Sequence, residues 1–194
     1  MAIYDARTAL LVIDMQNDFA DPAGGLYVEN GDAVVPLVNR EIERARSAGA
    51  AIVYTQDWHP GVTPHFSKDG GTWPVHCVKG TWGAELHPEL DVHGDVVRKG
   101  SGGEDGYSGF SVRDPGGDAV HDTTLEALLR AKGIERVVVV GLATDYCVGE
   151  TALDALERGF GTTVLRAAVR PVDLNPGDGE RALERVTAAG GRVE

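Results

Sequence analysis

The fold of this chain is indicated most clearly by the stretch Val137-Val138-Val139-Val140-Gly141-Leu142-Ala143-Thr144-Asp145-Tyr146-Cys147-Val148. It opens with four β-branched residues in a row, which is typical of a strand buried on both faces of a sheet. Gly141 interrupts this run. The apolar residues from Val148 onward are spaced by three or four, as on the buried face of a helix. The stretch therefore predicts a buried strand that turns directly into a helix.

Cys147 lies in the first turn of this predicted helix, which Thr144 or Asp145 can cap. The unpaired N–H groups and the positive end of the helix dipole at that position favour a thiolate over a thiol. A cysteine on a strand-to-helix turn is placed like a nucleophile. From this stretch alone, a buried structural cysteine is an equally good interpretation, because free cysteine is among the most buried residue types.

The composition is that of a single globular domain covering residues 1–194, with 42% hydrophobic and 25% charged residues. The net charge of −12, without any basic stripe, argues against nucleic acid and anionic membranes as partners. No signal peptide and no membrane-spanning run is recognisable. Cys77 and Cys147 lie in unlike contexts, so we expect a cytoplasmic chain with reduced thiols. Whether the chain forms a homo-oligomer is left open.

Short apolar runs alternate with amphipathic segments along the chain. Strands are predicted at 9–14, 51–55, 95–99, 137–140, 162–165 and 192–193. Helices are predicted at 32–48, after the capping box Thr123-x-x-Glu126, from Cys147 onward, and at 179–189. This alternation predicts an α/β fold with three layers, in which helices cover both faces of a mainly parallel six-stranded sheet.

Ionisable side chains follow four of the predicted strands. Asp14 ends the first strand, Asp57 and His59 follow the second, Lys99 ends the third, and Cys147 follows the fourth. In parallel α/β sheets, ligands bind beyond the carboxyl ends of the strands, where the strand order reverses. We therefore expect these side chains to lie together at one edge of the sheet.

The first group at this edge is Asp14, Lys99 and Cys147. A thiol needs a base or a nearby cation to be nucleophilic at neutral pH. Asp14 can take the thiol proton and return it to a leaving amine, while Lys99 stabilises the anions. Backbone N–H groups between Gly141 and Cys147 are suited to an oxyanion hole. A simple ion pair of Asp14 with Lys99 is the alternative, but Cys147 in register with both favours catalysis.

The second group begins with Asp57 and His59 and continues into the irregular segment 61–94. A connection of this length in a compact domain is usually functional. Carboxylate and imidazole ligands suit zinc, iron or manganese, and three protein ligands leave positions for water or substrate. A solvated loop explains Asp57-x-His59 as well. His76 is a further candidate ligand, and spacing alone does not separate it from its rivals, which are His65, His87, His93 and His121.

Several stretches carry a family resemblance, in the same order along the chain. They are Leu11–Phe19, Gln56–Pro60, Trp73–Val78, Lys99–Gly100 with Asp105–Phe110, and Gly141–Val148 with Thr151–Ala155. Together they resemble the nicotinamidase/pyrazinamidase branch of the isochorismatase-like cysteine hydrolases. The block Trp-Pro-x-His-Cys, with Asp-x-His, separates this branch from relatives that lack the metal, such as isochorismatases. Gly106 is a departure, since the family often has serine there.

The resemblance implies a Rossmann-like fold of the isochorismatase-like hydrolase type. It also implies an amidase that converts nicotinamide, and pyrazinamide as well, to the acid and ammonia in NAD salvage. By the same resemblance, Cys147 is the nucleophile, Asp14 the acid/base and Lys99 the third member. The N–H groups of Ala143 and Cys147 form the oxyanion hole, next to a cis peptide bond between Leu142 and Ala143.

The resemblance further implies one divalent metal ion, zinc with iron or manganese as alternatives, held by Asp57, His59 and His76. Phe19 and Trp73 are expected to sandwich the pyridine ring, whose nitrogen meets the metal. Two further residues are expected to line the substrate pocket, namely Gln16 and Tyr107. The alternative functions are an amidase of the same superfamily for another small carboxamide or ureido compound, and a non-catalytic binding protein on the same fold.

Overall fold

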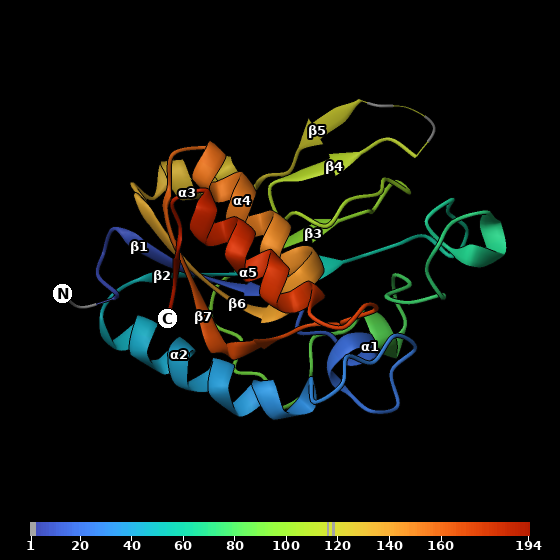
Figure 1. Cartoon of the computed structure of the whole chain (residues 1–194), viewed down its shortest axis with the longest axis horizontal. Coiled ribbons are helices and arrows are strands. Elements are labelled where there is room, and N and C mark those ends of the chain that lie inside the picture. The colour runs from blue at the N-terminus through green and yellow to red at the C-terminus, as the bar shows by residue number, and fades with distance from the viewer. Residues whose placement is uncertain (1–2, 116, 118) are drawn as a thin grey trace.

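The protein is built on one parallel sheet, shown in Figure 1. The computed structural model describes residues 3–115, 117 and 119–194. The strand order is β3-β2-β1-β6-β7-β8, and every neighbouring pair is parallel. The strands are β1 (Thr8–Ile13), β2 (Ala51–Asp57), β3 (Asp95–Lys99), β6 (Arg136–Leu142), β7 (Gly161–Arg170) and β8 (Arg192–Val193). The predicted six-stranded sheet is confirmed.

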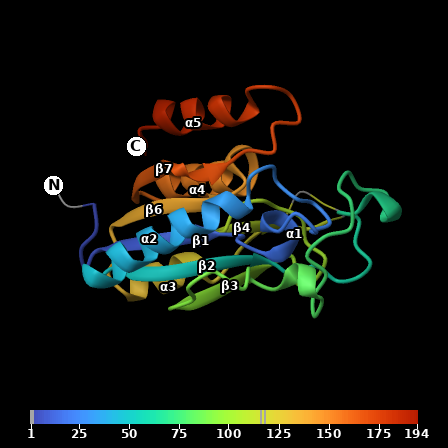
Figure 2. The same cartoon turned by 90° about the horizontal axis from the view of Figure 1, so that it is seen from below.

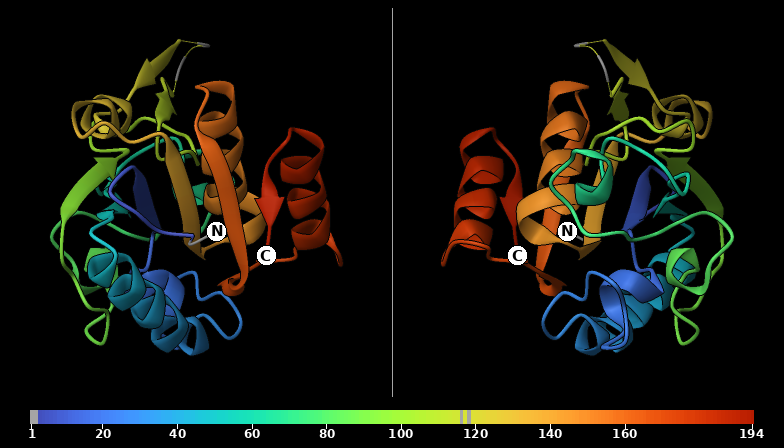
Figure 3. Two further views of the ribbon diagram at one scale, coloured as in Figure 1. Left: turned by 90° about the vertical axis from the view of Figure 1, so that its left-hand side faces the viewer. Right: turned by 90° about the vertical axis from the view of Figure 1, so that its right-hand side faces the viewer.

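Helices cover both faces of this sheet, as Figure 3 shows. One face carries α2 (Val35–Ser47), and the other carries α3 (Leu125–Ala131), α4 (Gly149–Glu157) and α5 (Asp178–Ala188). Across the described residues, no helix has both the length and the apolar character needed to cross a membrane.

The valine run of β6 is buried on both sides, as its composition predicts. Successive strand residues point to opposite faces. Val138 and Val140 therefore join the core under α2, while Val137 and Val139 join the core under α3, α4 and α5. The neighbouring central strand β1 is buried along its whole length.

The strand order reverses at β1. From β1 the chain moves outward through β2 to β3, and it then crosses to β6 on the other side of β1. The reversal therefore lies between β1 and β6, beyond whose ends lie Asp14 and Cys147. Figure 2 shows the first part of the segment 61–94 projecting past the ends of β2 and β3, near α1 (Asn17–Ala20), while its last residues return beside β2, where Tyr54 donates to the Asp91 carbonyl. This segment contains only short helical turns, at Ser67–Asp69 and Trp82–Ala84.

Local details differ from the sequence-based expectations. The predicted capping box does not form: Thr123 Oγ1 accepts the N–H of Leu125 at 3.1 Å, and Glu126 pairs with Arg158 instead of turning back. The chain between β3 and α3 adds an antiparallel hairpin of β4 (Ser111–Arg113) and β5 (Val120–Asp122). These three-residue strands were not predicted, because so short a run carries no measurable periodicity.

We expect Leu11→Ala to destabilise the protein by about 2–5 kcal/mol, because it removes a side chain that is 0% exposed between Val53 of β2 and Val139 of β6. Urea denaturation followed by circular dichroism measures the change. The matched control is Leu174→Ala, since Leu174 is 62% exposed. Its stability should change by no more than about 0.5 kcal/mol. Equal effects at the two positions would contradict the assignment of β1 to the core.

Candidate active site

Asp14 is held at the end of β1 by a hydroxyl group of β2. It follows Ile13 and has a left-handed backbone (φ 46°), which turns the chain away from the sheet. Its side chain is fully buried. Thr55 Oγ1 donates to Asp14 Oδ1 at 2.6 Å and accepts the Asp14 N–H at 3.1 Å. The carboxylate is thereby fixed before any ligand arrives.

Lys99 ends β3 and lies between two carboxylates and the thiol. Its Nζ is 2.9 Å from Asp14 Oδ2, donates to Asp57 Oδ1, and is 3.6 Å from Cys147 Sγ. Burial acts to lower the pKa of Lys99, but the Asp14 and Asp57 carboxylates raise it well above its ordinary value. Lys99 is therefore a permanent buried cation.

Cys147 lies on a π-helical turn, Thr144–Val148, that precedes α4 and in which the Val148 N–H donates to the Ala143 carbonyl at 3.0 Å. The expected cis peptide bond between Leu142 and Ala143 is present at the start of this turn. The expected cap is different: Ala143 occupies the N-cap position, while the Asp145 carboxylate accepts the N–H groups of Val172 and Asp173. Ala143 and Cys147 both line the same cavity.

The electrostatics of Cys147 differ from the sequence-based expectation of a thiolate. Burial raises the pKa of the Cys147 thiol well above its ordinary value, and Lys99 opposes this rise only in part. Removal of water from around the thiol therefore has a larger effect on its pKa than the position at the start of a helix. The thiol keeps its proton and needs a base to become nucleophilic.

The two buried carboxylates have opposite pKa shifts. Burial raises the pKa of Asp14 despite the Lys99 ammonium. Burial acts in the same direction at Asp57, but Lys99, His59 and His76 outweigh it and lower the pKa of Asp57. Environments that separate two carboxylates in this way divide acid–base work from permanent charge. Asp14 can exchange a proton, whereas Asp57 stays ionised.

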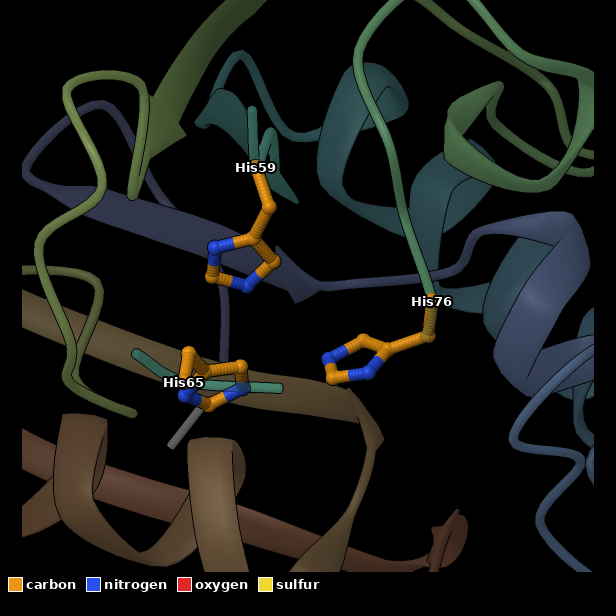
Figure 4. A group of neighbouring side chains, drawn as sticks. All are labelled: His59, His65 and His76. Atoms are coloured by element: carbon orange, nitrogen blue, oxygen red, sulfur yellow. The ribbon is translucent and has the colours of Figure 1, made fainter. Parts of the chain in front are cut away.

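Three imidazoles gather beside Asp57, as Figure 4 shows for His59, His65 and His76. One ring nitrogen of each lies within 4.8 Å of those of the other two. Nε2 of His59 and of His76 lie 3.8 Å and 3.9 Å from Asp57 Oδ2. All four side chains are buried.

The free ring nitrogens of this cluster fit a metal ion. Neither nitrogen of His59 has a hydrogen-bond partner among the described residues, although the ring is buried. Nδ1 of His76 is 2.8 Å from the Pro74 carbonyl, and Nδ1 of His65 is 2.7 Å from Asp105, which leaves the Nε2 atoms available. Burial lowers the pKa of His76 to about 4, so its ring is neutral at pH 7. Neutral imidazoles with one carboxylate are suitable ligands for zinc, iron or manganese.

The structure thus narrows the choice of histidines that spacing left open. His65 joins His59 and His76, whereas the other candidates lie elsewhere. His121 is exposed and pairs with Asp114, and His93 is exposed beside Arg46. His87, although buried, is not part of the cluster.

An aromatic cavity connects the thiol with the histidine cluster. Predicted pocket residues that line it are Phe19, Trp73 and Tyr107. Trp73 Nε1 donates to the Tyr107 hydroxyl at 3.1 Å, so the two rings are fixed relative to each other. Several apolar lining residues were not expected in the pocket, namely Leu26, Val28, Leu142, Tyr146 and Val172. Of these, Leu142 and Tyr146 had a signal, since both lie in the stretch that leads to Cys147.

Gln16 faces away from this cavity. Its Oε1 accepts the Asp57 N–H at 2.8 Å, and its Nε2 donates to the Asp57 carbonyl at 2.7 Å and to the Ala84 carbonyl at 2.9 Å. The amide therefore holds the backbone of Asp57 in the manner of a neighbouring strand. Expected to line the pocket, Gln16 instead supports Asp57, which lies beside the histidine cluster.

Comparisons with known proteins agree with this arrangement. The nicotinamidase of Escherichia coli (strain K12) is 38% identical in an alignment of 200 positions, which covers 94% of this chain and 92% of that protein. The solved pyrazinamidase of Pyrococcus horikoshii, in complex with zinc, is 41% identical with a TM-score of 0.87, over 97% of this chain and 98% of that one. PnC1 from L. infantum, solved with nicotinate, is 33% identical with a TM-score of 0.88. The match covers 100% of this chain and 96% of that one.

The family model for the isochorismatase domain matches residues 8–194, from the first residue of β1 to the end of the chain. The match thus includes the whole sheet and every residue of the cavity described above. On sequence and on fold, the chain belongs to the isochorismatase family.

Proposed function

We propose that this chain is a metal-dependent cysteine amidase that hydrolyses nicotinamide to nicotinate and ammonia, and accepts pyrazinamide, as a step of NAD salvage in the cytoplasm. The observation that carries the proposal is the position of the Lys99 ammonium. It contacts Asp14 and Asp57 and lies 3.6 Å from Cys147 Sγ. One buried cation thus joins a nucleophile and its base to a candidate metal ligand, within a single domain of residues 1–194.

The first chemical step forms a thioester. Asp14 takes the thiol proton as Cys147 Sγ attacks the carboxamide carbon, so that one S–C bond forms. The backbone N–H groups of Ala143 and Cys147 receive the oxyanion, and Lys99 stabilises the charges around the thiol. Asp14 then gives its proton to the amide nitrogen as the C–N bond breaks and ammonia leaves.

The second step restores the enzyme. Water attacks the thioester carbon and gives a proton to Asp14. The C–S bond breaks, nicotinic acid is released, and the proton held by Asp14 returns to Cys147 Sγ. The raised pKa of Asp14 suits this repeated exchange, because a carboxylate of ordinary pKa is a weaker base toward a thiol.

We assign the metal to Asp57, His59 and His76, with His65 as a neighbouring third imidazole, and zinc as the ion. When bound, this ion supplies a Lewis acid that can attach a ring nitrogen of the substrate. Phe19, Trp73 and Tyr107 provide flat apolar walls that suit a pyridine or pyrazine ring. An aliphatic ureido compound would make poorer use of these walls.

We expect Cys147→Ala to lower ammonia release from nicotinamide by roughly 10⁴-fold or more, because the nucleophile is lost. Metal content should stay at the level of the parent protein. The matched control is Cys77→Ala: Cys77 is the other cysteine, it is 0% exposed, its Sγ donates to the Gly83 carbonyl at 3.9 Å, and it does not line the cavity. This control should keep close to the parent turnover. Near-normal turnover in Cys147→Ala would overturn the mechanism.

A substrate panel on the same metal-loaded protein tests the choice of amide. Ammonia release should have its highest kcat/KM with nicotinamide or pyrazinamide. Release from an N-carbamoyl or ureido compound alone would replace the proposed substrate with the alternative one. Release from no amide at all would favour a non-catalytic binding protein on this fold.

Gly100→Ala should lower the affinity for the metal by about 10- to 100-fold, as is typical when the support of a ligand is lost. A Cβ at this position would lie 2.7 Å from Cε1 and Nδ1 of His59, so the ring must move. The matched control is Gly103→Ala. Gly103 also has a positive φ (96°, against 77° at Gly100), but a Cβ there meets nothing closer than 3.8 Å.

Metal titration of the chelator-stripped variants gives the dissociation constants. Activity after chelation and metal return should follow the same order. Equal affinities in Gly100→Ala and Gly103→Ala would contradict the placement of His59 in the metal site.

The pH dependence of kcat/KM should show an acid limb above pH 3.8, the ordinary pKa of an aspartate, because burial raises the pKa of Asp14. The sign follows from the role of Asp14 as a base: activity is present above its raised pKa and is lost as pH falls through it. Steady-state rates across the acid range measure the limb. Circular dichroism and metal content at each pH separate it from unfolding and metal loss. A limb at or below pH 3.8 would contradict the role of Asp14.

A further inference from the structure

Thr55 has no role in the proposed chemistry, yet its hydroxyl group both donates a hydrogen bond to Asp14 and accepts one from it. Thr55 lies within β2 and is 0% exposed. Its hydroxyl makes two hydrogen bonds to one residue, to the Asp14 carboxylate and from the Asp14 N–H. Position 55 is two residues before Asp57, so both side chains point to the same face of the strand.

The direction of these hydrogen bonds is fixed by the chemistry of a hydroxyl group. A hydroxyl has one proton to donate. Because a carboxylate oxygen can only accept, that proton is donated to Asp14 Oδ1 at 2.6 Å, while a lone pair of Thr55 Oγ1 accepts the Asp14 N–H. The two oxygens of the carboxylate are therefore not equivalent.

Oδ2 of Asp14 has different contacts from Oδ1. It lies 2.9 Å from Lys99 Nζ, but among the described residues it accepts no hydrogen bond, even though it is buried. An oxygen of this carboxylate lies within 4.8 Å of Cys147 Sγ. With Oδ1 held by Thr55, Oδ2 keeps a lone pair for the thiol proton.

We propose that Thr55 is a positioning residue for catalysis: its hydroxyl holds the Asp14 carboxylate so that Oδ2 receives the proton of Cys147. The proposal rests on the roles given above to Asp14 and Cys147. Without the hydroxyl, Oδ1 loses its donor and the carboxylate can turn, so that both of its oxygens approach the Lys99 ammonium. Oδ2 can then turn away from the thiol and no longer receives its proton.

The alternative is that Thr55 only fills space in β2. Its methyl group faces Gly109, where an added Cβ would lie 3.0 Å from Thr55 Cγ2. Thr55→Val keeps the β-branched shape and loses only the hydroxyl. Thr55→Ser and Thr55→Ala both lose the methyl group and differ from each other by the hydroxyl alone. These three variants separate packing from hydrogen bonding.

We expect Thr55→Val to lower kcat by about 10- to 100-fold, the range of a hydrogen bond to a charged group, with KM within about threefold of the parent. Thr55→Ser should recover kcat to within a few-fold of the parent, and Thr55→Ala should not. The matched control is Thr162→Val in β7, whose buried hydroxyl donates to the Phe160 carbonyl away from the cavity. Its kcat and KM should be unchanged.

Alkylation of Cys147 by iodoacetamide gives a second readout that needs no substrate. The thiol must lose its proton to react, so Thr55→Val and Thr55→Ala should be alkylated more slowly than the parent and than Thr55→Ser. Mass spectrometry distinguishes Cys147 from the buried Cys77. Thermal melts identify any variant that does not fold. If Thr55→Val does not fold, the comparison of Thr55→Ser with Thr55→Ala still measures the effect of the hydroxyl group.

Equal kcat in Thr55→Ser and Thr55→Ala would overturn the proposal, because the hydroxyl would then be irrelevant. Equal alkylation rates in these two variants would overturn it as well. If the parent protein does not hydrolyse nicotinamide, the proposed substrate is wrong, and the alkylation rates still decide the role of Thr55.

Discussion

The candidate site depends on the buried ammonium group of Lys99 between the carboxylates of Asp14 and Asp57. A charge buried without a partner costs several kcal/mol, so these three groups require one another. Each of them lies at or just beyond the end of a different strand, β1, β2 or β3. The ion cluster therefore fixes three strand ends relative to one another, and it places Asp14, beside the Cys147 thiol, next to a candidate metal ligand.

The same lysine acts on two carboxylates with opposite results. Asp57 also faces His59 and His76, which help Lys99 to lower its pKa. Asp14 lacks these partners, and the nearby negative charge of Asp57 adds to the effect of burial. The pKa of Asp14 is therefore raised. One carboxylate can therefore exchange protons with a thiol that keeps its own proton, while the other stays charged beside the histidines.

Where the backbone pairing of β1 with β2 ends, hydrogen bonds from side chains connect the two segments. The paired residues stop at Val12 with Tyr54. Beyond them, Thr55 of β2 holds Asp14, and Gln16 beyond β1 holds the backbone of Asp57. A residue of β2 thus positions Asp14 just beyond β1, and a residue beyond β1 positions Asp57 at the end of β2. This exchange explains why two polar residues are fully buried although neither faces the cavity.

The sequence by itself determined the six strands, the turn into the Cys147 helix, and the gathering of Asp14, Lys99 and Cys147 at one edge. Periodicity reports which face of an element is buried, and parallel strands end at a common edge. Only the tertiary structure decided that His65 joins His59 and His76, that Thr55 and Gln16 support the two carboxylates, and that Cys147 keeps its proton. These features depend on how irregular segments pack and how completely water is excluded, and neither leaves a periodic pattern in the sequence.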